Sequence, residues 1–252
     1  MTDANPINID DQVALITGAS RRIGAAIAQR LHAAGMRVAV HYRSSESEAL
    51  ELRDRFNSAR KASAAAFQAD LITEGEPARL VAAVADHFGS IHALVNNAST
   101  FYPTPIGEID EKNWKDLVGS NLKAPVFLSQ AAAPYLLDSR GSIVNLVDIH
   151  ASRPLKDHHV YGAAKAGLAM LTRSLARDLA PHVRVNGVSP GAIAWPEDGM
   201  TEETKQKILE QVPLGRSGDP TDIANAVLFL LRDATYSTGQ IIAIDGGRSV
   251  GW

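Results

Sequence analysis

Hydrophobic and polar positions along this chain follow two periods, one typical of strands and one typical of helices. Short and almost continuous apolar runs predict buried strands at residues 13–16, 38–41, 64–68, 93–95, 143–147, 183–188 and 241–244. Between these runs, apolar residues recur at helical spacing, as at Ile23, Ile27 and Leu31. Strands that alternate with helices predict βαβ units and a parallel sheet, and nearly continuous apolar strands predict a sheet covered on both faces.

The length and the loops favour one folding unit. We predict a single domain over residues 1–252, with an α/β fold of the Rossmann type in which helices flank a doubly wound parallel sheet. At 45% hydrophobic residues the chain can bury a sizeable core, and no segment has the composition of a linker. The polar and acidic residues 1–11 are predicted to form a flexible N-terminal tail. Ligands of such sheets bind beyond the carboxyl ends of the strands, so we expect the functional residues in those loops.

Composition removes several classes of function. The net charge is −3 and basic residues are not clustered, so no nucleic-acid partner is expected. The absence of cysteine excludes disulfides, thiolate metal sites and a cysteine nucleophile. No signal peptide is recognisable, and no apolar stretch approaches the roughly 18 residues of a membrane span, so we expect a soluble, cytoplasmic protein without a membrane partner. Three histidines (His150, His158 and His159) lack a carboxylate at helix-ligand spacing, and no metal site is predicted.

The segment 13–24 has the pattern of a strand, a turn and the start of a helix. Small residues in the turn let backbone N–H groups approach a pyrophosphate, and the helix dipole favours the negative charge. Gly18 and Gly24 would supply the close approaches. Taken alone, the segment is also compatible with an ordinary turn between a strand and a helix.

The end of the second predicted strand indicates which dinucleotide would bind. No Asp or Glu stands where an NAD enzyme would hold the ribose 2′-hydroxyl; His41, Arg43, Ser44 and Ser45 stand there instead. Positive charge and hydroxyl donors suit an anionic 2′-phosphate, which favours NADP(H). Ser44 or Ser45 could equally cap the next helix, and the two roles are compatible.

Tyr161 and Lys165 are four residues apart and share one face if the segment is helical. A nearby ammonium would lower the tyrosine pKa from about 10 by stabilising the phenolate. The pair could then act as a general acid for a group that receives a hydride. The Tyr-x-x-x-Lys pattern is common by chance, so its meaning depends on its context.

That context resembles the short-chain dehydrogenase/reductase family from Val13 to Gly247. The matching motifs are Thr17-Gly18 with Gly24, Asp70, Asn96-Asn97-Ala98, Asn121, Tyr161 with Lys165, and Pro190-Gly191. The resemblance implies one doubly wound domain with a seven-stranded parallel sheet, usually assembled as a homotetramer.

The resemblance also implies roles for the matching residues. Tyr161 would be the acid, Lys165 would bind the nicotinamide ribose and tune Tyr161, and Asn121 would position a proton-relay water. Asp70 would contact the adenine, and Asn97 would line the cofactor cleft. The residues expected to bind NADPH or NADP⁺ are Gly18, Arg22, Ile23, His41, Tyr42, Arg43, Ser44, Asp70, Leu71, Asn97, Ala98, Ser99, Tyr161, Lys165, Pro190, Gly191 and Ile193.

Two positions depart from the common family pattern. Arg22 replaces a loop glycine, and could reach both the pyrophosphate and the active site or stand exposed at the helix start. Asp148 stands where most members have Ser. An ionised Asp cannot donate to a carbonyl oxygen and would repel an oxyanion, so it suits a substrate with N–H donors or a C=N bond. Alternatively, Asp148 caps a turn.

These departures resemble the pteridine reductase branch of the family. The matches are residues 17–24, residues 41–44, the run Ala98-Ser-Thr-Phe-Tyr-Pro-Thr-Pro105 and the triplet Asp148, Tyr161 and Lys165. The resemblance implies that Phe101 sandwiches a pterin against the nicotinamide while its polar edge meets Arg22, Ser99 and Tyr161. Phe101 and Tyr102 could instead pack the loop. Trp195 and Met200, in the flanking loop 192–204, could touch the substrate or hold that loop down.

The leading hypothesis is an NADPH-dependent pteridine reductase that transfers hydride to dihydropterins. Dihydrobiopterin-like substrates are expected first, with oxidised pterin, dihydromonapterin and dihydrofolate as further candidates. The expected catalytic residues are Asp148, Tyr161, Lys165 and Asn121, and the expected substrate contacts are Arg22, Ser99, Phe101, Asp148, Tyr161 and Trp195. The alternatives are a carbonyl reductase of the 3-oxoacyl-carrier-protein type and a non-catalytic NADP(H)-binding regulator.

Overall fold

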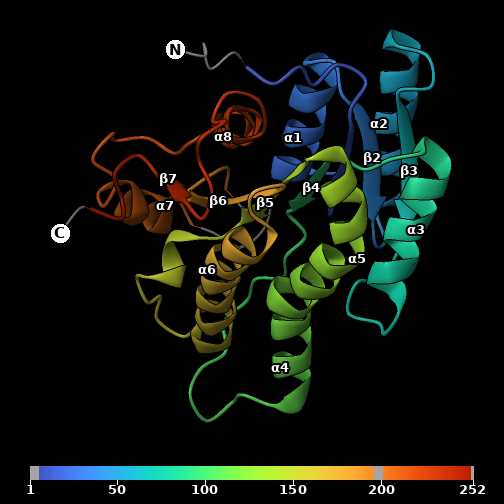
Figure 1. The fold of residues 1–252 in the computed structure, drawn as a ribbon. Coiled ribbons are helices and arrows are strands. Elements are labelled where there is room, and N and C mark those ends of the chain that lie inside the picture. The colour runs from blue at the N-terminus through green and yellow to red at the C-terminus, as the bar shows by residue number, and fades with distance from the viewer. Residues whose placement is uncertain (1–5, 196–200, 251–252) are drawn as a thin grey trace.

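A computed structural model describes residues 6–195 and 201–250 of the chain. Its strands form one parallel sheet of seven strands in the order β3-β2-β1-β4-β5-β6-β7 (Figure 1). The strands are β1 (Val13–Ile16), β2 (Arg37–Tyr42), β3 (Ala64–Gln68), β4 (Ala93–Asn96), β5 (Ser142–Leu146), β6 (Arg184–Pro190) and β7 (Ile241–Ile244). The strand order reverses between β1 and β4, which confirms the predicted doubly wound α/β fold.

Helices cover both faces of the sheet (Figure 1). They are α1 (Arg22–Ala33), α2 (Glu46–Ala59), α3 (Glu76–Phe88), α4 (Glu111–Val118), α5 (Ala124–Ser139), α6 (His159–Leu179), α7 (Glu202–Leu209) and α8 (Pro220–Arg232). One core contains buried residues of α1, α2 and α8, and a second core contains those of α3, α5 and α6. Fully buried Leu31 of α1 and Leu80 of α3 show the two inward helix faces. None of the helices in the described part of the chain is both long and apolar enough to cross a membrane.

The N-terminal segment differs from the prediction of a flexible tail. Ile9 is buried in the first core, and Ile7 packs against it. The backbone N–H of Ile7 donates to the carbonyl of Arg232 at 2.8 Å. Two isoleucines among polar residues are therefore enough to hold residues 7–9 against the end of α8; residues 1–5 lie outside the described range.

Close packing at the carboxyl ends of β1 and β4 creates the frame of the site. The Thr17 hydroxyl accepts from the backbone N–H groups of Asn97 (2.9 Å) and Ala98 (3.0 Å). Gly18 has φ +60°, and a Cβ there would lie 3.1 Å from the Cα of Ala98. A Cβ on Gly24 would lie 2.0 Å from the Gly18 carbonyl oxygen, so α1 can begin this close to the turn only with glycine.

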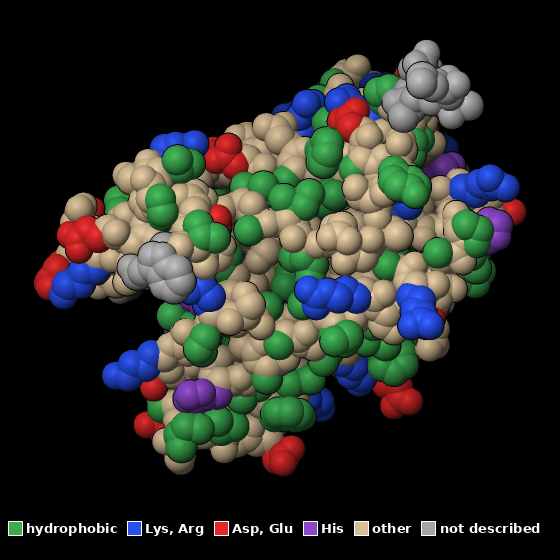
Figure 2. All heavy atoms as spheres, turned by 60° about the vertical axis from the view of Figure 1, so that its left-hand side comes forward, with side chains coloured by type: hydrophobic (Ala, Val, Ile, Leu, Met, Phe, Trp, Pro, Cys, Tyr) green, Lys and Arg blue, Asp and Glu red, His purple; other side chains and the backbone are tan. Residues whose placement is uncertain are grey.

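Charged side chains are dispersed on one face of the molecule. On the face that Figure 2 shows, Lys and Arg side chains are scattered among polar and hydrophobic groups and form no continuous basic patch. This distribution agrees with the formal net charge of −3.

Candidate active site

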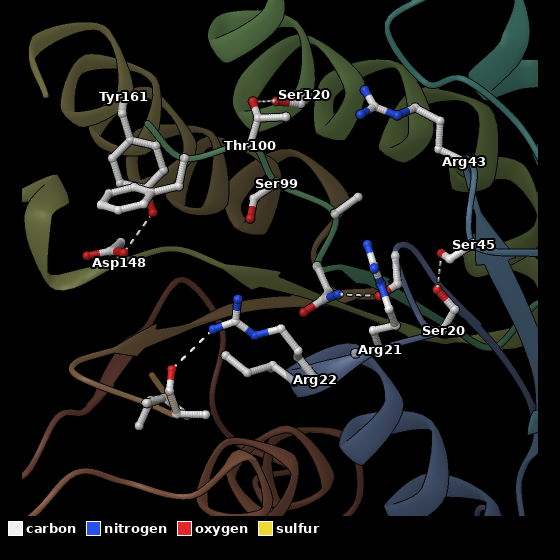
Figure 3. A pocket seen from close by; sticks show the side chains of 18 of the residues that line it. Ser20, Arg21, Arg22, Arg43, Ser45, Ser99, Thr100, Ser120, Asp148 and Tyr161 are labelled. Atoms are coloured by element: carbon white, nitrogen blue, oxygen red, sulfur yellow. Dashed lines mark hydrogen bonds between the residues drawn. The ribbon is translucent and has the colours of Figure 1, made fainter. Parts of the chain in front are cut away.

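A pocket of about 810 Å³ opens at the carboxyl edge of the sheet, between α1, the loops after the strands and α7. A recess of about 130 Å³ adjoins it and reaches Lys165 and Pro190. Every residue predicted to bind cofactor or substrate lines one of these two spaces. Asn121 is the exception among the predicted catalytic residues, because it lines neither. Figure 3 shows Asp148 and Tyr161 at one end of the pocket, Arg43, Ser45 and Ser20 at the other, and Ser99 between them.

The end near β2 is lined by hydroxyls and arginine. The hydroxyls of Ser20 and Ser45 hydrogen-bond at 2.7 Å, and Arg43 and Ser44 line the same space. The lining residues directly after β2 are Arg43, Ser44 and Ser45, and none of these three carries a carboxylate. Ser45 is the N-cap residue of α2, but its side chain makes no capping hydrogen bond, so its hydroxyl faces Ser20 and the pocket. This end fits an anionic group that needs donors.

His41 does not offer the positive charge expected of it. Its ring is 2% exposed, Nδ1 accepts from the Gly18 backbone N–H at 3.0 Å, and Nε2 donates to the Ala69 carbonyl at 3.1 Å. Burial lowers its pKa from 6.5 to about 4, with smaller opposing effects of Ala69 and Asp70, so the ring is neutral at pH 7. His41 therefore shapes the turn after β1, and the cations at this end are arginines.

The start of α1 fits a pyrophosphate. Its N-cap residue, Arg21, makes no side-chain cap, and the first turn has no acidic residue, so first-turn N–H groups and the positive end of the helix dipole are available to an anion. Arg22 has φ +51°, a left-handed conformation that favours glycine. Its Nη2 donates to the carbonyl of Ala194 at 3.1 Å, and Figure 3 shows its side chain between the two ends of the pocket. Arg22 is thus a lining residue that ties α1 to the loop after β6.

Asp148 and Tyr161 are joined directly. The Tyr161 hydroxyl donates to Asp148 Oδ2 at 2.7 Å, and the other oxygen, Oδ1, accepts from the backbone N–H of His150 at 2.8 Å (Figure 3). Asp148 thus caps the short 3₁₀ helix Ile149–Ala151 and at the same time lines the pocket. Burial, and then the Asp148 charge, raise the pKa of Tyr161. The expectation that Lys165 lowers this pKa is wrong for the structure, because a carboxylate is the direct partner.

Lys165 lies one helical turn beyond Tyr161 on α6. It is 3% exposed, and its Nζ donates to the carbonyl of Leu146 at 2.8 Å. The same nitrogen lies 5.7 Å from the centre of the Tyr161 ring. Burial lowers the pKa of Lys165 from 10.5 to about 8, although Asp148 opposes the shift. The structure thus brings Asp148, Tyr161 and Lys165 together beside the smaller recess.

Asn121 lies in a feature that periodicity did not predict, the π-helix Gly119–Lys123 between α4 and α5. Its amide nitrogen donates to the carbonyls of Thr100 (2.9 Å) and Leu117 (3.0 Å). Its Oδ1 is buried and has no hydrogen-bond partner among residues 6–195 and 201–250. A buried acceptor of this kind suits an ordered water, and π-bulges occur frequently at functional sites.

Phe101 and Tyr102 differ in position, because Phe101 lines the pocket whereas Tyr102 packs the loop. Phe101 is 54% exposed and lines the pocket, with its ring stacked on His158 (centroids 4.6 Å apart, 19° between planes). It also meets Tyr161 edge-on at 4.8 Å. Tyr102 packs with Leu117 and Tyr161 and holds the loop down. One face of an exposed aromatic ring is thus backed by His158 at the substrate end.

Several lining residues were missed or set aside. They include Ile208 of α7, Leu155, His150 and His158, and Arg248 after β7. The signal for Arg248 was available, because β7 is parallel to its neighbours and its carboxyl end must reach the same edge. Trp195 lines the pocket as predicted. Met200 and the C-terminal Trp252 lie outside the described residues.

Comparisons with known proteins point to reductases. Residues 18–249 match the family model described as Enoyl-(Acyl carrier protein) reductase. The chain is 39% identical to Pteridine reductase 1 of Leishmania tarentolae, over 94% of this chain and 96% of that protein. It is also 39% identical to the 3-oxoacyl-[acyl-carrier-protein] reductase FabG of Staphylococcus aureus, over 93% and 96%. The Granaticin polyketide synthase putative ketoacyl reductase 2 of Streptomyces violaceoruber is 37% identical, over 93% and 95%.

Proposed function

Because this chain belongs to the short-chain dehydrogenase/reductase family, we propose that it is an NADPH-dependent pteridine reductase that converts dihydropterins to tetrahydropterins. Overall sequence identity does not distinguish a pterin substrate from a 3-oxoacyl substrate, since the chain is 39% identical to relatives of both kinds. The observation that carries the proposal is the carboxylate of Asp148, 2.7 Å from the Tyr161 hydroxyl. A carboxylate at this point accepts hydrogen bonds and repels a developing oxyanion.

The residues present fit NADPH. The uncapped start of α1 suits the pyrophosphate, and Arg43 with Ser20, Ser44 and Ser45 suits the 2′-phosphate. Lys165 would bind the nicotinamide ribose from the smaller recess. When bound, NADPH supplies the hydride.

The protein's own part is to hold the ring and supply a proton. The raised pKa of Tyr161, caused first by burial and then by Asp148, keeps its hydroxyl protonated at pH 7. The Tyr161 Oη therefore holds a proton beside the substrate end of the pocket. Its transfer to a ring nitrogen would leave a phenolate, which the ammonium of Lys165, 5.7 Å from the ring centre, would stabilise. Asp148 Oδ2 orients that hydroxyl and can accept from N–H groups of a pterin. The exposed face of Phe101 offers a plane on which a flat heteroaromatic ring can stack.

A substrate comparison in Asp148→Ser tests the proposal. The wild-type protein is expected to oxidise NADPH with dihydrobiopterin and to use NADH poorly. Asp148→Ser should lower kcat/KM for dihydrobiopterin by about 100-fold, the size of effect seen when one preorganised polar contact is removed. Asp86→Ser, on the exposed side of α3, makes the same chemical change outside the pocket and should leave the rate unchanged. Turnover of a 3-oxoacyl thioester without turnover of any pterin or dihydrofolate would reject the pteridine assignment.

A 3-oxoacyl reductase is the second candidate, supported by the FabG relative. In that case Asp148→Ser should raise the rate with a 3-oxoacyl thioester, because serine restores a donor to the carbonyl oxygen. Tyr161→Phe should remove most activity with either substrate, since both reactions need the hydroxyl proton. Residual NADPH binding by Tyr161→Phe, measured by cofactor fluorescence, separates lost chemistry from lost folding.

We infer in addition that the protein assembles as a homotetramer. The outer sides of α5 and α6 expose large hydrophobic residues, with Phe127 44% exposed, Leu137 40% and Met170 62%. Large apolar side chains gathered on neighbouring helices are typical of surfaces that another chain covers. We call Phe127, Leu137 and Met170 the α5–α6 surface.

A further inference from the structure

Arg248 brings a second arginine to the substrate end of the pocket. It follows β7 and lines the same pocket as Asp148, Tyr161 and Phe101. Burial lowers the pKa of its guanidinium, while Asp148 opposes the shift and Arg153 adds to it. An arginine remains charged at pH 7 despite such a shift. The substrate end therefore combines one carboxylate with a cation that the reduction itself does not require.

The backbone around Arg248 is fixed. The two oxygens of Asp245 accept from the backbone N–H groups of Gly247 (3.0 Å) and Ser249 (2.6 Å). The N–H of Arg248 donates to the Asp245 carbonyl at 3.1 Å, and its own carbonyl accepts from Arg153 Nη1. A turn held on both sides of Arg248 limits where its side chain can reach, which is a form of preorganisation for binding.

The guanidinium of Arg248 is only weakly used within the protein. Its Nη2 donates to Gln211 Oε1 at 3.3 Å, a long bond to a neutral acceptor. Across residues 6–195 and 201–250, no carboxylate forms an ion pair with it. A partly buried cation without a paired anion has lost hydration that a ligand carboxylate can replace.

We propose that Arg248 selects substrates with an anionic substituent, by binding a carboxylate carried on the side chain of the reduced ring. The inference rests on the proposed pteridine reductase function and narrows its substrate class to acidic pterins, of which the glutamyl-bearing dihydrofolate is a chemical example. Asp148 and Tyr161 would hold the ring, and Arg248 would hold the acidic group at the pocket wall. A neutral side chain, as in dihydrobiopterin, leaves Arg248 without that partner.

The test compares one acidic and one neutral substrate in Arg248→Gln. For dihydrofolate, KM should rise and kcat/KM should fall at least about tenfold, because a charge-assisted contact is lost. For dihydrobiopterin, kcat/KM should stay within about twofold. Arg248→Lys, which keeps the charge but not the forked geometry, should recover part of the loss with dihydrofolate. Added salt should raise the KM for dihydrofolate in the wild-type protein more than in Arg248→Gln.

Arg53→Gln on α2 removes the same charge away from the pocket and serves as the control. Equal losses for both substrates in Arg248→Gln, or no loss for either, would overturn the proposal while leaving the pteridine reductase function intact. If the wild-type protein reduces neither pterin, the proposed function fails and this inference fails with it. A melting temperature of Arg248→Gln close to that of Arg53→Gln excludes misfolding as the cause of the loss.

Discussion

Lys165 carries an ammonium group at an almost fully buried position. It is 3% exposed, and burial lowers its pKa from 10.5 to about 8. Because the folded chain binds this proton less tightly than the unfolded chain, the charged form opposes folding at pH 7 by about 3 kcal/mol. The penalty shrinks as pH rises from about 8 towards 10.5, since the folded lysine becomes neutral before the unfolded one does.

Lys165→Met is therefore expected to stabilise the cofactor-free protein while it abolishes the reductase activity. The free energy of unfolding at pH 7 should rise by up to about 3 kcal/mol, and the gain should be much smaller at pH 9.5. Urea unfolding at the two pH values measures the difference. Lys112→Met, at an exposed position of α4, should change neither value. A gain that does not depend on pH would show that side-chain packing, and not the charge, is responsible.

For single residues, sequence predicted which side chains lie in the pocket but not which groups they hydrogen-bond. The spacing of Tyr161 and Lys165 predicted their shared helix face, and the unusual Asp148 was recognised as a pocket residue. The direction of the Tyr161 pKa was predicted wrongly, because sequence does not show that the hydroxyl donates to Asp148 or that Lys165 donates to Leu146. The charge assigned to His41 failed for the same reason, since its two ring partners are backbone groups of distant loops.

At the scale of elements, the backbone at the start of α1 is strained at Arg22, and the side chain of this residue lines the pocket. Arg22 has φ +51°, where a side chain costs about 1 kcal/mol relative to glycine. Arg22→Gly should raise the free energy of unfolding by about that amount and weaken NADPH binding, because the pocket loses an arginine and its bond to Ala194. Arg21→Gly, at φ −139°, relieves no such strain and should not stabilise the protein. A destabilised Arg22→Gly, measured by urea unfolding, would contradict this account.

The ends of β1, β2 and β3 are linked through the neutral ring of His41. Burial lowers its pKa from 6.5 to about 4. Between pH 6.5 and about pH 4, the histidine is therefore protonated in the unfolded chain but not in the folded chain. The free energy of unfolding should therefore fall as pH falls from about 6.5 to 4, by up to about 3 kcal/mol from this group.

Replacing the ring tests that prediction. His41→Gln should be less stable at pH 7, since it loses the contact to Gly18 or to Ala69, but its stability should fall less steeply with acid. His182→Gln, an exposed histidine before β6, should keep the wild-type slope. Urea unfolding at several pH values between 4 and 7 gives the slopes, and equal slopes in all three proteins would rule out His41 as the source.

Sequence predicted the elements better than their irregularities. The strands at residues 13–16, 64–68 and 241–244 have the predicted bounds, and the other four differ at their ends by one or two residues. The strand positions are predicted accurately because a strand buried on both faces must be apolar throughout. The π-helix at Gly119–Lys123 was not predicted, because one extra residue in a turn barely alters the apolar period. The packed residues 7–9 were missed because two isoleucines form no period at all.

At the scale of the whole molecule, the site exists because parallel strands end at one edge. The loops after all seven strands, β1 to β7, contribute to the pocket. Sequence order could predict that edge, and the family resemblance could assign roles to the residues that match its motifs. Sequence order brings Arg248 to this edge because it follows β7, but it does not predict that the side chain shares a pocket with Asp148, since the turn after β7 is set by the Asp245 contacts.

Other copies of the chain are expected to cover the α5–α6 surface. A homotetramer should have about four times the chain mass of 26.9 kDa by light scattering after gel filtration. Met170 is 62% exposed on α6, so Met170→Glu costs the isolated chain little but would bury a charge in an interface, and it should lower the mass. Ile106→Glu changes a 75% exposed residue in the loop before α4 and should leave the mass unchanged. A wild-type monomer, or a Met170→Glu protein of full tetramer mass, would show that other chains do not cover this surface.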